Sequence, residues 1–206
     1  MEQEPPSETR FQATVPEQPG KRTPAPGSLR PLQDFANTFD IDDNADLLSS
    51  ADDLRNWLVT KELLDPSEPV GADEHRTVLT VREAVRELLL ANAGEPADPE
   101  AVPVINTAAG DAWLALTIAS PGQVVMTPEA PGVAGAIGRI LAVVFLSMLD
   151  GTWSRLKACR NPDCQWAFFD WSKNKSGVWC AMTVCGNREK ARRFRRRRRA
   201  PREEVP

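Results

Sequence analysis

Four cysteines within a span of 27 residues constrain this 206-residue chain more than any other feature. They form two pairs, Cys159 with Cys164 and Cys180 with Cys185, with four residues inside each pair and fifteen between the pairs. Two tight loops that each supply two thiolates suit a tetrahedral metal site. The aromatic run 166–171 and the turn-like segment 172–177 predict a hairpin between the pairs that brings the two loops together.

Zinc is the metal that we expect, because it accepts four thiolates in a closed tetrahedron and has no redox chemistry of its own. The single histidine, His75, lies far upstream in a predicted helix, where we expect it at the surface. Two disulfides or four buried free thiols are the alternatives. The acidic segment 1–6 lacks the apolar core of a secretory signal, which favours the reducing cytoplasm, where disulfides are rare. We therefore expect one structural zinc ion on Cys159, Cys164, Cys180 and Cys185.

Charge divides the chain into an acidic body and a basic module. Residues 1–157 hold 24 acidic and 12 basic side chains, whereas residues 158–199 hold 12 basic and three acidic ones. This asymmetry predicts a polyanionic partner that only the C-terminal module contacts.

Nine of the twelve residues from Arg188 to Arg199 are arginine or lysine, which predicts a basic helix. Val184, Ala191 and Phe194 are expected to form an apolar side that packs on the metal module. The candidate nucleic-acid contacts are Asn187, Arg188, Lys190, Arg192, Arg193, Arg195, Arg196, Arg197, Arg198 and Arg199, with Lys173 and Lys175 from the preceding loop.

Within this set, Arg188 and Arg192 are assigned to oriented base contacts and residues 195–199 to phosphates. A turn role competes with base contact at Asn187. A solvated basic tail or an acidic protein partner is the alternative to nucleic acid, and the helix alone does not separate DNA from RNA.

The segment 159–199 resembles the CGNR zinc finger. The resemblance rests on the tetrapeptide 185–188, on Asp170 in the aromatic run, on the Ser-x-Asn-x-Ser loop 172–176, and on Trp179 before Cys180. The segment 32–38, Leu-Gln-Asp-Phe-Ala-Asn-Thr, resembles the opening of the ABATE domain, which usually precedes such a finger. The resemblance implies DNA binding and transcription regulation, with an N-terminal domain that senses a signal or mediates assembly.

Residues 1–28 are rich in Pro, Glu, Gln, Ser and Thr, so we expect a disordered tail there, and a second short tail at 200–206. Ser50, with Asp52 and Asp53 after it, predicts the start of a helix. Apolar spacing predicts helices at 51–64, 73–93, 101–109 and 133–149, and a hairpin from strands 113–118 and 123–127. A short helical connector is expected at 153–157. The acidic run from Asp40 begins like a calcium loop, but it has Ala45 and Ala51 where glycine and glutamate are required, so we expect a solvated stretch.

The expected fold class is α+β: a mostly helical domain with one β-hairpin at 29–152, then at 153–199 a four-cysteine zinc-finger module with a hairpin and a basic C-terminal helix. The apolar stretch 133–149 contains Arg139 and is shorter than the roughly 20 residues of a membrane span, so we expect a buried helix and no membrane partner. We find no catalytic constellation and expect no enzyme activity. The sequence does not predict the oligomeric state.

Overall fold

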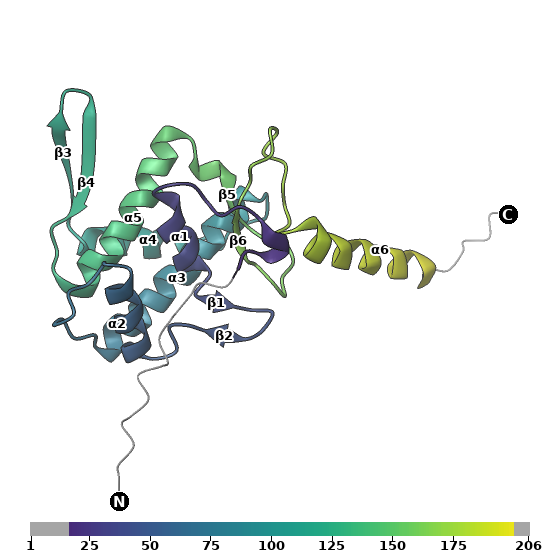
Figure 1. Cartoon of the computed structure of the whole chain (residues 1–206), viewed down its shortest axis with the longest axis horizontal. Helices are drawn as coiled ribbons and strands as arrows, with labels where there is room; N and C mark the ends of the chain where they lie inside the picture. Colours follow the sequence, from purple (N-terminus) through teal and green to yellow (C-terminus); the bar gives the residue numbers. More distant parts are fainter. Residues whose placement is uncertain (1–16, 200–206) are drawn as a thin grey trace, which may run out of the picture.

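The computed structural model describes residues 17–199, a helical body from which a hairpin and a long helix project (Figure 1). The body elements are α1 (Leu29–Ala36), β1 (Phe39–Asp40), β2 (Ala45–Asp46), α2 (Ala51–Thr60), α3 (Ala72–Asn92), α4 (Ala101–Asp111), β3 (Leu114–Ser120), β4 (Gln123–Pro128) and α5 (Gly132–Asp150). The C-terminal module comprises the 3₁₀ turn η2 (Trp153–Arg155), β5 (Leu156–Ala158), β6 (Ala167–Phe169), the π-helical turn η3 (Met182–Gly186) and α6 (Asn187–Arg199). Strands pair antiparallel as β1–β2, β3–β4 and β5–β6, which confirms the α+β class.

Local capping explains where the body helices begin. The Ser50 hydroxyl accepts the amide of Asp53 at 3.1 Å and starts α2, and the Glu74 carboxylate accepts the amide of Gly71 at 2.7 Å at the start of α3. Both helices were predicted, at 51–64 and 73–93, but the cap at Gly71 and Glu74 was not. Helix α2 stops at Thr60, before the predicted end, because Glu62 adopts a left-handed φ of 58°.

Helix α5 is the centre of the body. It packs against α1, α3 and α4, and buries Ile140, Leu141 and Val144. Gly138 allows β4 to approach, since a Cβ there would lie 2.7 Å from the Cβ atoms of Ala112 and Pro128. In the described part of the chain, α5 alone has the length and hydropathy of a membrane span, but 56% of that window is buried inside the protein. Its apolar surface is therefore used by the core.

The core of the body continues into the C-terminal module. Leu156, Ala158, Ala167 and Phe169 of the β5–β6 hairpin belong to the same buried cluster as the helices. The Asn37 side chain pairs with the open edge of β6: its Oδ1 accepts the Ala167 amide at 2.7 Å, and its Nδ2 donates to the Ala167 carbonyl at 2.9 Å. The predicted boundary at residue 152 thus runs through one continuous hydrophobic core.

The N-terminal segment differs from expectation. Residues 17–28 were predicted to be disordered, yet η1 (Pro19–Lys21) lies beside η3, and Gln18 and Ala25 are buried. The few apolar residues inside the segment cannot order it by themselves. Hydrogen bonds to residues about 150 positions later stabilise it instead. The remaining predicted tails, 1–16 and 200–206, lie outside the described residues.

Two further predictions about the module need correction. The hairpin lies on either side of the first cysteine pair, as β5 and β6, and does not lie between the two pairs. The predicted helical connector 153–157 ends after one 3₁₀ turn, because Leu156 and Lys157 already pair with Phe169 and Phe168. Residues 156–157 form a strand instead of a helix because strand pairing buries Leu156 completely.

Candidate zinc centre and basic helix

Two loops bring the four cysteines together. Cys159 follows β5, and a tight turn in which the Asn161 carbonyl accepts the amides of Cys164 and Gln165, at 2.9 and 3.0 Å, presents Cys164. Gln165 has a φ of 47°, which reverses the chain into β6. In the second loop, η3 carries Cys185 back towards Cys180, and the Gly186 amide donates to the Ala181 carbonyl at 3.1 Å.

The sulfur atoms have the geometry of a tetrahedral site. All four Sγ atoms lie within 4.8 Å of one another, and Cys164 Sγ is 3.7 Å from Cys180 Sγ. A zinc–sulfur distance of about 2.3 Å places the sulfurs of a tetrahedron about 3.8 Å apart. The four side chains are buried and form no disulfide, and Asn161 Nδ2 donates to Cys185 Sγ at 3.6 Å. The donor set therefore fits zinc, and the disulfide alternative does not apply.

Electrostatics also favour a cation among the sulfurs. Hydrogen bonds from the Cys164 and Cys180 side chains lower the pKa of Cys159 to about 2. Their hydrogen bonding to the Cys159 sulfur raises the pKa of both Cys164 and Cys180. A divalent cation stabilises all four thiolates together, which their mutual repulsion otherwise opposes.

A buried carboxylate organises the loop between the two pairs. Asp170 is fully buried; it accepts Lys157 Nζ at 3.0 Å, the Ser172 amide at 3.0 Å and the Gly177 amide at 2.7 Å. Burial raises the pKa of Asp170, but the hydrogen bonds from Ser172, Lys157 and Gly177 outweigh it and lower this pKa to about 2. A Cβ on Gly177 would lie 2.9 Å from the carboxylate, so glycine is required there.

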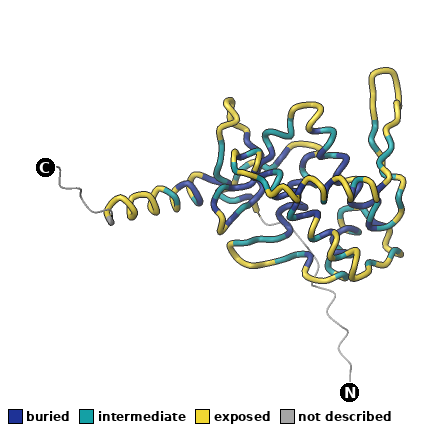
Figure 2. The backbone as a smooth tube through the Cα atoms, turned by 180° about the vertical axis from the view of Figure 1, so that it is seen from behind, coloured by how far each residue is buried: buried dark blue, intermediate teal, exposed yellow. Residues whose placement is uncertain are grey.

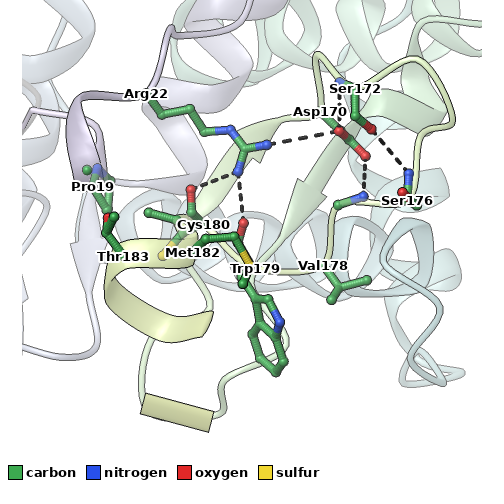
Figure 3. Close-up of a pocket in the computed structure, with 13 residues that line it drawn as sticks. Pro19, Arg22, Asp170, Ser172, Ser176, Val178, Trp179, Cys180, Met182 and Thr183 are labelled. Atoms are coloured by element: carbon green, nitrogen blue, oxygen red, sulfur yellow. Dashed lines mark hydrogen bonds and ion pairs between the residues drawn. The ribbon is translucent and has the colours of Figure 1, made fainter. Parts of the chain in front are cut away.

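Arg22 ties the N-terminal segment to the second cysteine loop (Figure 3). Its Nη1 donates to the carbonyls of Trp179 and Cys180, each at 2.8 Å, and its guanidinium lies 4.3 Å from the centre of the Phe168 ring. Burial lowers the pKa of Arg22 without removing its charge. Arg22 and Lys157 were missed from sequence, where no motif or spacing marks either residue.

Comparison with known protein families agrees with this geometry. The profile of the CGNR zinc finger matches residues 155–198, and the profile of ABATE, described as "Putative stress-induced transcription regulator", matches residues 29–150. This chain belongs to the ABATE family. Its CGNR finger follows the ABATE domain, as the two motifs predicted, and makes this a zinc-binding protein. No curated protein matches the chain.

The basic helix α6 starts at the zinc centre and extends away from the ABATE domain (Figures 1 and 2). Its first turns touch the module, through η3 and through Arg192, which reaches Asp163 of the first cysteine loop. The predicted apolar packing is correct for half-buried Val184 and wrong for Ala191 and Phe194, which are exposed, Phe194 by 55%. Because α6 extends away from the body, its later turns have no protein surface beside them among the described residues.

Three arginines of α6 form ion pairs within the protein. Arg188 Nη1 donates to Asp42 Oδ2 at 2.6 Å, Arg192 Nη2 to Asp163 Oδ2 at 3.2 Å, and Arg193 Nε to Glu189 Oε1 at 2.7 Å. The Asp42 carboxylate raises the pKa of Arg188. The aspartate stretch that was expected to be solvated thus reaches the finger.

The other predicted contact residues are divided between α6 and a loop. Asn187 Nδ2 donates to the Thr183 carbonyl at 3.3 Å, which is the competing turn role. The side chains of Lys190, Arg195, Arg196, Arg197 and Arg198 are exposed and have no ion-pair partner among residues 17–199; the Arg199 side chain lies outside the description. Lys173 and Lys175 lie on the loop after β6, where Lys175 Nζ donates to Ser154 Oγ at 3.1 Å.

Proposed function

We propose that this ABATE-family protein is a DNA-binding transcription regulator, in which the CGNR finger and α6 bind the duplex. The observation that carries the proposal is the exposed basic helix, which projects from a buried four-sulfur centre and away from an acidic body. A helix of this kind enters a major groove and contacts phosphates through its arginines.

One structural zinc ion is proposed for the finger. Cys159, Cys164, Cys180 and Cys185 would hold it, and with four protein ligands no position is left for a water or a substrate. The ion would supply folding energy to the two loops and so orient the start of α6. We accordingly propose a binding protein without enzyme activity, located in the reducing cytoplasm, where four free thiolates persist.

The residues divide into two groups by their contacts. Arg195, Arg196, Arg197 and Arg198 are free to contact phosphates, and the Arg199 position continues this run. Arg188 and Arg192 lie nearer the zinc centre, where orientation is defined, and we assign base contacts to them once their carboxylate partners are displaced. Lys173, Lys175 and Lys190 are candidates for additional phosphate contacts.

Duplex binding over a range of salt concentrations tests the proposal. Log affinity should fall linearly with log salt, by about 0.9 per phosphate contact. Truncation after Phe194 removes Arg195 to Arg199 together with Arg202, and it should flatten that slope while weakening binding to every sequence. No binding of zinc-loaded protein to duplex at low salt would contradict the proposal.

RNA or an acidic protein partner is the second candidate, because the exposed arginines of α6 suit any polyanion. Competition separates the candidates: if single-stranded or structured RNA displaces the protein from duplex more effectively than duplex itself does, RNA is the partner. Selection from a random duplex pool near physiological salt then tests specificity.

A further inference from the structure

The β3–β4 hairpin stands away from the body in both overall views (Figures 1 and 2). Within the described residues β3 and β4 pair only with each other, from Leu114 opposite Pro128 to Ser120 opposite Gln123. The base is fixed: the Glu129 amide donates to the Trp113 carbonyl at 3.3 Å, and β4 packs against α5. The outer part of the ribbon leaves both strand edges open.

One face of this ribbon is apolar and exposed. Leu116 lies opposite Met126 and Ile118 opposite Val124, so these four side chains share a face. Leu116 is 64% exposed, Ile118 79% and Val124 53%. A two-stranded ribbon is marginally stable in water, and natural proteins protect open edges with charges or cover them. This ribbon has no such charge, so a partner surface is indicated.

The charge pattern identifies the partner. Residues 29–150 hold 20 acidic and seven basic side chains, yet none lies between residues 112 and 128. An uncharged apolar face does not suit nucleic acid or a charged protein surface. Two acidic bodies repel each other, and the projecting charge-free ribbon is the place where two copies approach with least repulsion. We propose that the β3–β4 hairpin is a dimerisation arm whose apolar face packs on the same face of a second copy of this chain.

The size of the arm sets the strength of the dimer. Two short ribbons bury less than the roughly 1,200–2,000 Å² of a standard interface, so we expect dissociation in the micromolar range. A two-fold axis through the ribbons would place two α6 helices on one complex, which matches a DNA site with two half-sites. This consequence rests on the proposed function, whereas dimerisation itself does not.

Sedimentation velocity of the zinc-loaded full chain, without nucleic acid, tests the arm from about 1 to about 200 µM. The wild type should shift from monomer to dimer over this range. Ile118→Lys places a charge on the apolar face and should weaken association by at least about tenfold. Thr117→Lys is the matched control, because it adds the same charge to the opposite face of the same strand and should leave the dimer intact. Circular dichroism and zinc content should be equal in the three proteins.

Three results would overturn the proposal: a wild type that stays monomeric throughout, an Ile118→Lys variant that dimerises as well as the wild type, or equal loss in both variants. A wild type that stays monomeric but binds duplex would overturn the arm and leave the proposed function standing. A wild type that dimerises but does not bind duplex would support the arm and overturn the proposed function.

Discussion

Arg188 of the CGNR tetrapeptide is bound to Asp42 of the β1–β2 turn, with 2.6 Å between Nη1 and Oδ2. The two residues are 146 positions apart, and both side chains are partly exposed. The contact joins the ABATE domain directly to the start of the basic helix. A phosphate that reaches Arg188 must compete with this carboxylate, so the ABATE domain can influence the finger through one ion pair.

Replacement of Asp42 should therefore release Arg188 for nucleic acid. We expect Asp42→Asn to tighten duplex binding by up to about fivefold, since an exposed ion pair contributes at most about 1 kcal/mol. Asp43→Asn is the matched control, because it removes the same charge from the same turn without an ion-pair partner among the described residues. Fluorescence anisotropy at one low salt concentration measures both. Equal changes in the two variants would mean that only the net charge matters.

Loss of one thiolate should release the metal and loosen the second cysteine loop. We expect Cys185→Ser to lower the zinc content from about one ion per chain to nearly none. Hydrogen exchange should then increase most in η3 and α6, and less in β5 and β6, because the latter strands are held in the core of the ABATE domain. Equal exchange increases in all four elements would show that the zinc centre, and not the shared core, stabilises the hairpin.

Asp170 should make the finger sensitive to acid. Its pKa in the folded protein is about 2, below the ordinary value of 3.8. This depressed pKa stabilises the fold above pH 4, and the stabilisation, about 2 kcal/mol, is lost as the pH falls from 4 to 2. We expect the difference in unfolding free energy between wild type and Asp170→Asn to be constant above pH 4 and to shrink below it. Urea unfolding at each pH measures this difference.

Arg22 should stabilise the finger although it lies outside both family profiles. Arg22→Ala removes two hydrogen bonds to the carbonyls of Trp179 and Cys180, and we expect a loss of about 2 kcal/mol in unfolding free energy. Arg22→Lys should recover only part of it, since an ammonium does not reproduce the planar donor pair. Lys21→Ala removes a neighbouring exposed charge and should have little effect. If Lys21→Ala lowered the unfolding free energy as much as Arg22→Ala, net charge and not the two hydrogen bonds would explain the stabilisation.

The sequence by itself determined the features that depend on neighbouring residues. Cysteine spacing predicted the four-sulfur centre, Ser50 and the acidic residues after it predicted the start of α2, and residues 113–128 predicted the β3–β4 hairpin. Each of these follows from steric and hydrogen-bonding rules that act within one turn, one loop or one helix.

Only the tertiary structure decided which charged side chains form ion pairs within the protein and where the domains meet. Arg188 and Arg192 looked free in sequence, but carboxylates from the β1–β2 turn and the first cysteine loop hold them. Asn37 appeared as part of a motif, and its role as a partner of β6 depends on a residue 130 positions later. Arg22 binds residues 157 and 158 positions away. Contacts at such separations leave no periodic or local mark in a sequence, because they arise from how packed elements face one another.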